Sequence, residues 1–270
     1  MSKQEEICEF FEAYDEKIEE FLDRYDNSHK NVGGNSFGFI GVLVAITSLI
    51  VAFLLYYTVD PTFSIFTHWI SHLGAGPNGS NVIFNIGLVI TSFFLFLFYM
   101  YHGREYRRSE GKRILVDILL ITTTITSCGL FLVAIFPYNL VVLHSTAALI
   151  FFISGLCSSL LYAIFVLTTK GISKFQAVVG FTTAGIFTFH LASSIMGNLY
   201  AGIDSRLVYF TEWLALFAMV FMIFEISFYT ERERHIFQKQ VKERFIDYNH
   251  RLSISNIISL REFISSTRKE

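Results

Sequence analysis

The ionisable residues within otherwise apolar stretches of this sequence include His144 at the start of one stretch, His190 late in the next, and Glu212 early in the last. An imidazole can act as a general base and a carboxylate can orient it, so these three residues are candidate catalytic groups. We commit none of them to a catalytic role. The same residues could instead bind a ligand. A third reading is a structural His190–Glu212 pair, since polar contacts often join helices within a membrane.

Two further histidines, His68 and His72, are four residues apart, a spacing that on a helix can present two imidazoles to one metal ion. His144 could supply a third ligand, which would make a zinc site of the catalytic type. The alternative is that these histidines are solvated at a membrane surface. We commit to no cofactor, and zinc stays an option.

The segment around these histidines predicts a short amphipathic helix lying at the membrane surface, over residues 62–73. On this interpretation one face of the helix dips toward the lipid and carries Phe63, Phe66, Trp69, Ile70 and Leu73. The opposite face carries Ser64, His68, Ser71 and His72.

The elements that must position these groups are membrane-spanning helices. Of the 270 residues 53% are hydrophobic and only 16% are charged, well below the roughly 25% charge of soluble domains. A bilayer core of about 30 Å needs about 20 apolar residues in a helix. Six stretches meet that length: 37–58, 82–101, 114–136, 142–168, 175–196 and 207–229. The sequence therefore predicts an all-α integral membrane protein with a bundle of six transmembrane helices.

The distribution of Lys and Arg predicts the orientation of the bundle. The connections after the second and fourth spans and the segment after the sixth span are rich in Lys and Arg, whereas the other three connections hold only Arg206. The positive-inside rule places both termini in the cytoplasm and the candidate residues in the outer leaflet. We expect the membrane to be the plasma membrane. The net charge of −2 gives no reason to expect a nucleic-acid partner.

Both tails show helical periodicity. We divide the chain into an acidic amphipathic cytoplasmic helix, 1–36, the transmembrane domain, 37–229, and a basic helical tail, 230–270. One interpretation is that the two tails pack against each other, or that the basic tail lies on anionic lipid headgroups. The other is that the tails form a docking site for a cytoplasmic protein partner or a dimerisation seam.

Several short phrases of the sequence carry a family resemblance. They are Ile70-Ser71-His72-Leu73-Gly74-Ala75, Phe84-Asn85-Ile86-Gly87-Leu88-Val89-Ile90, Ile135-Phe136-Pro137, and His144 followed by Ala147-Ala148 and Phe151-Phe152. In these phrases the chain resembles the prokaryotic membrane family called domain of unknown function 998. That family resembles in turn the damage-regulated autophagy modulator group, where Glu212-Trp213 has a counterpart. His72 departs from the pattern, because the family often has an acid there.

The resemblance implies six helices and no settled activity, and it places Asn85 beside the other outer-leaflet residues. We therefore expect one polar pocket, formed by Asn85, His144, His190 and Glu212, that binds or organises membrane lipid. The alternative is an intramembrane lipid-modifying hydrolase or acyl transferase that uses His and Glu, with or without a metal. A transporter is disfavoured, because no span contains a proline or a charged path across its middle.

Overall fold

The computed structural model describes residues 34–107, 113–199 and 204–232, and it contains six helices long and apolar enough to cross a membrane. They are α2 (Asn35–Tyr57), α3 (Ser80–Arg107), α4 (Arg113–Ile135), α5 (Val141–Thr168), α6 (Lys174–Leu199) and a last helix, Ser205–Arg232. The predicted all-α membrane protein with six spanning helices is confirmed. The predicted tail helices and their partner site lie outside the described residues.

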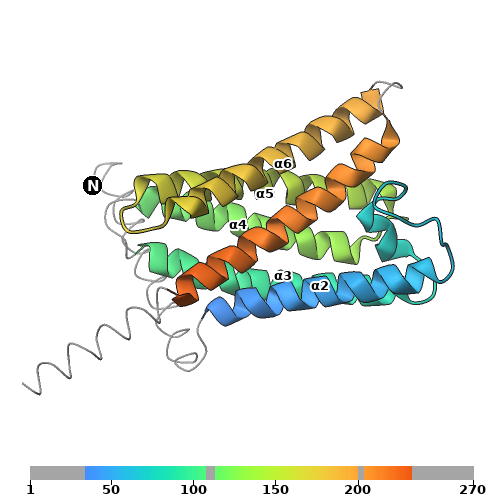
Figure 1. Cartoon of the computed structure of the whole chain (residues 1–270), viewed down its shortest axis with the longest axis horizontal. Coiled ribbons are helices and arrows are strands. Elements are labelled where there is room, and N and C mark those ends of the chain that lie inside the picture. Colours follow the sequence, from blue (N-terminus) through green and yellow to red (C-terminus); the bar gives the residue numbers. More distant parts are fainter. Residues whose placement is uncertain (1–33, 108–112, 200–203, 233–270) are drawn as a thin grey trace, which may run out of the picture. The chain divides into compact units, whose positions relative to one another are not determined.

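By its internal contacts the chain divides into two units, residues 1–227 and 228–270. The first unit contains α2 to α6 and the last helix up to Ser227. Its helices run lengthwise side by side, and the connection between α2 and α3 gathers at one end of them (Figure 1). We call this end the cap end and the opposite end the far end.

Most helix ends lie within two residues of their predicted positions, but α3 continues past Tyr101 to Arg107. These extra residues are polar, so hydropathy alone ends the span too early. Arg107 is held by α4, because its Nε donates to Asp117 Oδ1 over 2.6 Å. The pair stabilises the far end of the α3–α4 hairpin.

Consecutive helices pack against one another, from α2 on α3 to α5 on α6. Glycines allow the closest approaches. A Cβ added to Gly129 of α4 would lie 2.8 Å from the backbone nitrogen of Phe151 in α5, and one added to Gly87 of α3 would lie 2.2 Å from Ser48 Cβ in α2. Small residues at such crossings are the usual means of packing helices in a membrane, where the hydrophobic effect does not drive helices together.

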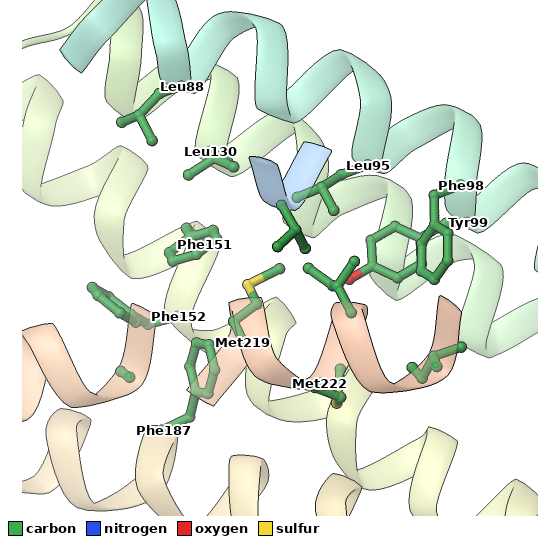
Figure 2. Packing of buried hydrophobic residues seen from close by; sticks show 14 of the residues in the cluster. Leu88, Leu95, Phe98, Tyr99, Leu130, Phe151, Phe152, Phe187, Met219 and Met222 are labelled. Carbon is green, nitrogen blue, oxygen red and sulfur yellow. The ribbon is translucent and has the colours of Figure 1, made fainter. Parts of the chain in front are cut away.

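Leucine, phenylalanine and methionine side chains from α3, α4, α5, α6 and the last helix meet in the centre of the bundle (Figure 2). The opposite faces of the helices are also apolar, and residues such as Leu43, Ile114 and Val142 are exposed. An apolar exterior around an apolar core is what a bundle surrounded by lipid requires.

The connection of residues 58–79, which we call the cap, does not form the predicted surface helix. It runs through turns to a short 3-10 helix, η1 (Ile70–Ala75), which packs on α3 and α2. Phe63, Ile70 and Leu73 are buried in protein rather than facing lipid, and Ser71 of the supposed polar face is buried as well. The periodicity was misleading because groups on distant helices satisfy the cap's backbone and allow it to fold inward.

Candidate functional site

The first part of the cap is a turn organised by Asp60. Its Oδ1 accepts hydrogen bonds from the backbone nitrogen of Thr62 at 2.9 Å and from the Thr62 hydroxyl at 2.6 Å. These bonds, with a smaller contribution from His68, lower the pKa of Asp60 below its ordinary value, so the carboxylate is charged at neutral pH. The Thr67 hydroxyl closes the turn by donating to the Thr62 carbonyl at 2.7 Å.

The second part of the cap is held by Glu212 of the last helix. Glu212 Oε2 accepts a hydrogen bond from the backbone nitrogen of Ile70 at 2.8 Å, and the backbone nitrogen and hydroxyl of Ser71 also donate to this carboxylate. The first N–H groups of η1 have no hydrogen-bond acceptor within their own helix, and the Glu212 carboxylate supplies one. Glu212 is only 6% exposed, and hydrogen bonds to a buried charge are among the stronger ones.

Two more side chains fix the cap on either side of this contact. Trp213 Nε1 donates to the carbonyl of His68 at 2.9 Å, just before η1, and Asn85 Nδ2 donates to the carbonyl of Gly74 at 2.9 Å, near its end. Glu212, Trp213 and Asn85 therefore clamp the cap between α3 and the last helix.

His190 does not pair with Glu212 in this structure. Its Nδ1 lies 3.1 Å from Thr211 Oγ1, which in turn lies 3.0 Å from Ser193 Oγ, and its ring is 4.3 Å from that of Phe152. His190 lies level with Thr211, the residue before Glu212, but neighbouring residues of a helix point about 100° apart. Thr211 therefore faces α6, while Glu212 faces the cap.

The other candidate histidines, His68, His72 and His144, form a row with Tyr138. The distance between ring centroids is 5.4 Å for His68 and His72, 4.2 Å for His72 and Tyr138, and 5.9 Å for Tyr138 and His144. Burial, and then the neighbouring His68 and His144, lower the pKa of His72 to about 4. His144 Nδ1 lies 2.7 Å from the Phe136 carbonyl, which requires that this nitrogen carries the proton.

Within residues 34–107, 113–199 and 204–232 no three His, Cys, Asp or Glu side chains come together as a metal-binding group. Tyr138 stands between His72 and His144 in the row, so its ring contacts both imidazoles. A zinc site formed by His68, His72 and His144 stays a prediction.

Ser71, His144 and Glu212 line one small cavity beneath η1, whose other walls are apolar. Its volume is about 40 Å³. A water molecule needs about 10 to 15 Å³ on this measure, so the cavity can hold a few waters but not a lipid headgroup.

A larger space, which we call the groove, lies on the outside of the bundle between α2 and the last helix. Its volume is about 360 Å³, and its lining is apolar. The cap contributes one wall through Ile65, and Trp213 stands beside it. The other lining residues are Ile46, Leu49, Ile50, Phe53, Leu54, Phe217 and Val220.

In the comparison with protein families, residues 39–222 match the model described as "Protein of unknown function (DUF998)". The chain belongs to the DUF998 family. No curated protein and no solved structure matches it.

The region matched to DUF998 contains every contact of the cap described above. Of the residues proposed from the sequence, Asn85 and Glu212 converge on η1, and His144 shares a cavity with Glu212. His190 belongs to a separate cluster. Sequence reasoning missed Ser71 and Trp213 as partners in the clamp, although an indole N–H beside a buried acid was a usable signal.

Proposed function

We propose that this protein binds a membrane lipid in the outer leaflet, with one acyl chain lying in the groove below the cap. The observation that carries the proposal is the groove itself. It is apolar throughout and is bordered by the cap, which the polar residues of the candidate site hold in place.

The length of the groove along α2 suits an acyl chain. The lining residues of α2 run from Ile46 to Leu54, a length of about 12 Å at 1.5 Å per residue. They lie in the half of α2 nearest the cap, which the Lys and Arg distribution assigns to the outer leaflet.

The shape of the groove favours a chain over a helix from another protein. At the far end α2 meets the last helix, where a Cβ added to Gly38 would lie 2.1 Å from Ser227 Oγ. At the cap end the ring of Phe63 lies 5.4 Å from that of Phe53 and 6.2 Å from that of Trp213. The groove ends at the far end and is narrow at the cap end, so a helix about 10 Å wide does not fit in it, whereas a flexible alkyl chain does.

The polar residues support this function indirectly. Glu212, Trp213 and Asn85 hold the cap, and the cap supplies the wall of the groove at Ile65. In this proposal the polar groups position the cap, and an adjacent apolar surface takes the lipid.

The test is native mass spectrometry of the full chain in detergent with added phospholipid. Ile50→Trp should fill the groove and reduce lipid binding, because Ile50 lines it and is 53% exposed. The matched control is Ile121→Trp on the outer face of α4, where Ile121 is 57% exposed and lines neither the groove nor the cavity. Equal binding by both variants and the wild type would refute the proposal.

A second candidate function rests on the cavity lined by Ser71, His144 and Glu212. A hydroxyl, an imidazole and a carboxylate around a space for water are the groups that hydrolysis or acyl transfer on a lipid needs. Incubation with fluorescent phospholipids would reveal released fatty acid or lysolipid. Loss of product in His144→Ala, with an unchanged unfolding temperature, would support this candidate, and no product from the wild type would remove it.

A further inference from the structure

We infer that the lipid in the groove carries a primary amine in its headgroup, as phosphatidylethanolamine does, and that its ammonium binds the carboxylate of Asp60. This inference rests on the proposed function and names the class of lipid.

The charges at the two ends of the bundle differ in sign. The connections at the cap end include residues 58–79 and 136–140, which contain Asp60 and no Lys or Arg, and Asp204 and Arg206 lie at the start of the last helix. The described residues at the far end include Arg107, Arg113 and Lys170. An anionic headgroup would therefore find little positive charge at the cap end, whereas a zwitterionic headgroup brings its own cation.

Asp60 is arranged to receive a cation. Thr62 donates to its Oδ1 from both the backbone nitrogen and the hydroxyl, which holds the carboxylate in one orientation. Its Oδ2 lies 3.7 Å from His68 Nε2, beyond hydrogen-bonding distance, and the side chain is 35% exposed. One oxygen is therefore fixed and the other is accessible to an ammonium group, which can donate up to three hydrogen bonds.

Asp60 also stands close to the groove along the chain. Its backbone nitrogen donates to the carbonyl of Tyr56 at 3.0 Å, and its carbonyl accepts from Phe63 at 3.1 Å. The ring of Phe63 lies 5.4 Å from Phe53 in the wall of the groove. From Leu54, at the edge of the groove, α2 rises about 4.5 Å to its end at Tyr57, and a short turn then leads to Asp60.

The experiment measures binding of three phospholipids with identical acyl chains to the full-length protein by native mass spectrometry. They carry ethanolamine, choline or glycerol headgroups. The wild type should bind the ethanolamine lipid about fivefold better than the glycerol lipid, the size expected for a partly exposed ion pair. Asp60→Asn should remove that preference, while Asp60→Glu should retain it and Asp204→Asn should leave it unchanged.

The outcomes separate this inference from the proposed function. Equal binding of all three lipids, stronger binding of the glycerol lipid, or an unchanged preference in Asp60→Asn would overturn the amine assignment. Equal binding of the choline and ethanolamine lipids would overturn it too, because choline cannot donate hydrogen bonds from its nitrogen. If Ile50→Trp still loses lipid in any of these cases, the groove stands without its headgroup specificity. If the wild type binds none of the lipids, both proposals fail.

Discussion

Glu212 and Glu225 lie on the same helix, about 20 Å apart at 1.5 Å per residue, and they show how the two ends of the bundle use a carboxylate differently. Glu212 is buried and accepts hydrogen bonds from the backbone of the cap. Glu225 is partly exposed and accepts from the side chain of Gln176, whose Oε1 accepts from the Tyr162 hydroxyl at 2.8 Å.

The comparison separates two kinds of polar contact in a membrane protein. At the far end, side chains of three helices bond to one another, and the backbones of those helices are already satisfied. At the cap end a side chain completes the backbone of an irregular segment. Loss of the second kind leaves buried N–H groups without an acceptor, which costs more than the net value of one hydrogen bond.

The largest expected effect follows from exchanging each carboxylate for an amide. Glu212→Gln should lower the free energy of unfolding by about 2 kcal/mol, because an amide keeps one acceptor oxygen and turns an NH₂ group toward the donors of Ile70 and Ser71. Glu225→Gln should change it by less than about 0.5 kcal/mol, since the amide oxygen still accepts from Gln176. Thermal unfolding in detergent measures both. Equal losses of stability in Glu212→Gln and Glu225→Gln would show that the two carboxylates do not differ in this way.

The next effect is a dependence of cap stability on pH. The pKa of His72 is about 4 in the folded protein and 6.5 when unperturbed. Between these values the unfolded chain binds a proton that the folded chain does not, so acid favours unfolding. The contribution is complete above pH 6.5 and is lost as the pH falls toward 4. Unfolding temperatures from pH 7 to pH 4 should fall more steeply for the wild type than for His72→Gln, and parallel curves would contradict the assignment.

A smaller effect concerns the indole of the clamp. Trp213→Phe keeps an aromatic ring beside the groove and removes the hydrogen bond to the His68 carbonyl, so it should cost about 1 kcal/mol. Proteolysis within residues 58–79 should become faster as the cap loosens. Trp69→Phe is the matched control, because the contacts of Trp69 are ring contacts with Tyr209 and His190. Faster proteolysis in Trp69→Phe but not in Trp213→Phe would mean that the indole of Trp69, and not that of Trp213, holds the cap.

The smallest effect belongs to the far half of the bundle. Tyr99 turns its hydroxyl into the apolar interior (Figure 2), where it is buried and has no hydrogen-bond partner among the described residues. Tyr99→Phe removes that unsatisfied group and should leave the unfolding temperature unchanged or raise it, by up to about 1 kcal/mol in stability. A clear loss of stability would mean that the hydroxyl has a partner and that the far half also depends on its polar groups.

The sequence was sufficient for the spans because hydropathy over about 20 residues depends only on local composition. The cap shows where this reasoning ends. The periodicity of residues 62–73 favoured a surface helix, but the segment turns inward because Glu212 and Trp213, more than 140 positions away, supply an acceptor and a donor. The sequence singled out Asn85 and Glu212 as ligand-binding candidates, and the structure brings both to the cap, but their partners there could not be known without the rotation of each helix.

Hydrogen exchange measured by mass spectrometry over residues 68–75 tests the central claim most directly. In the wild type the backbone amides of Ile70 and Ser71 should exchange slowly, because both donate to the buried Glu212 carboxylate. In Glu212→Gln their exchange should become faster, while exchange in α5 stays unchanged. Unchanged protection of these two amides in the variant would contradict the account, because the cap would then be held by something other than Glu212.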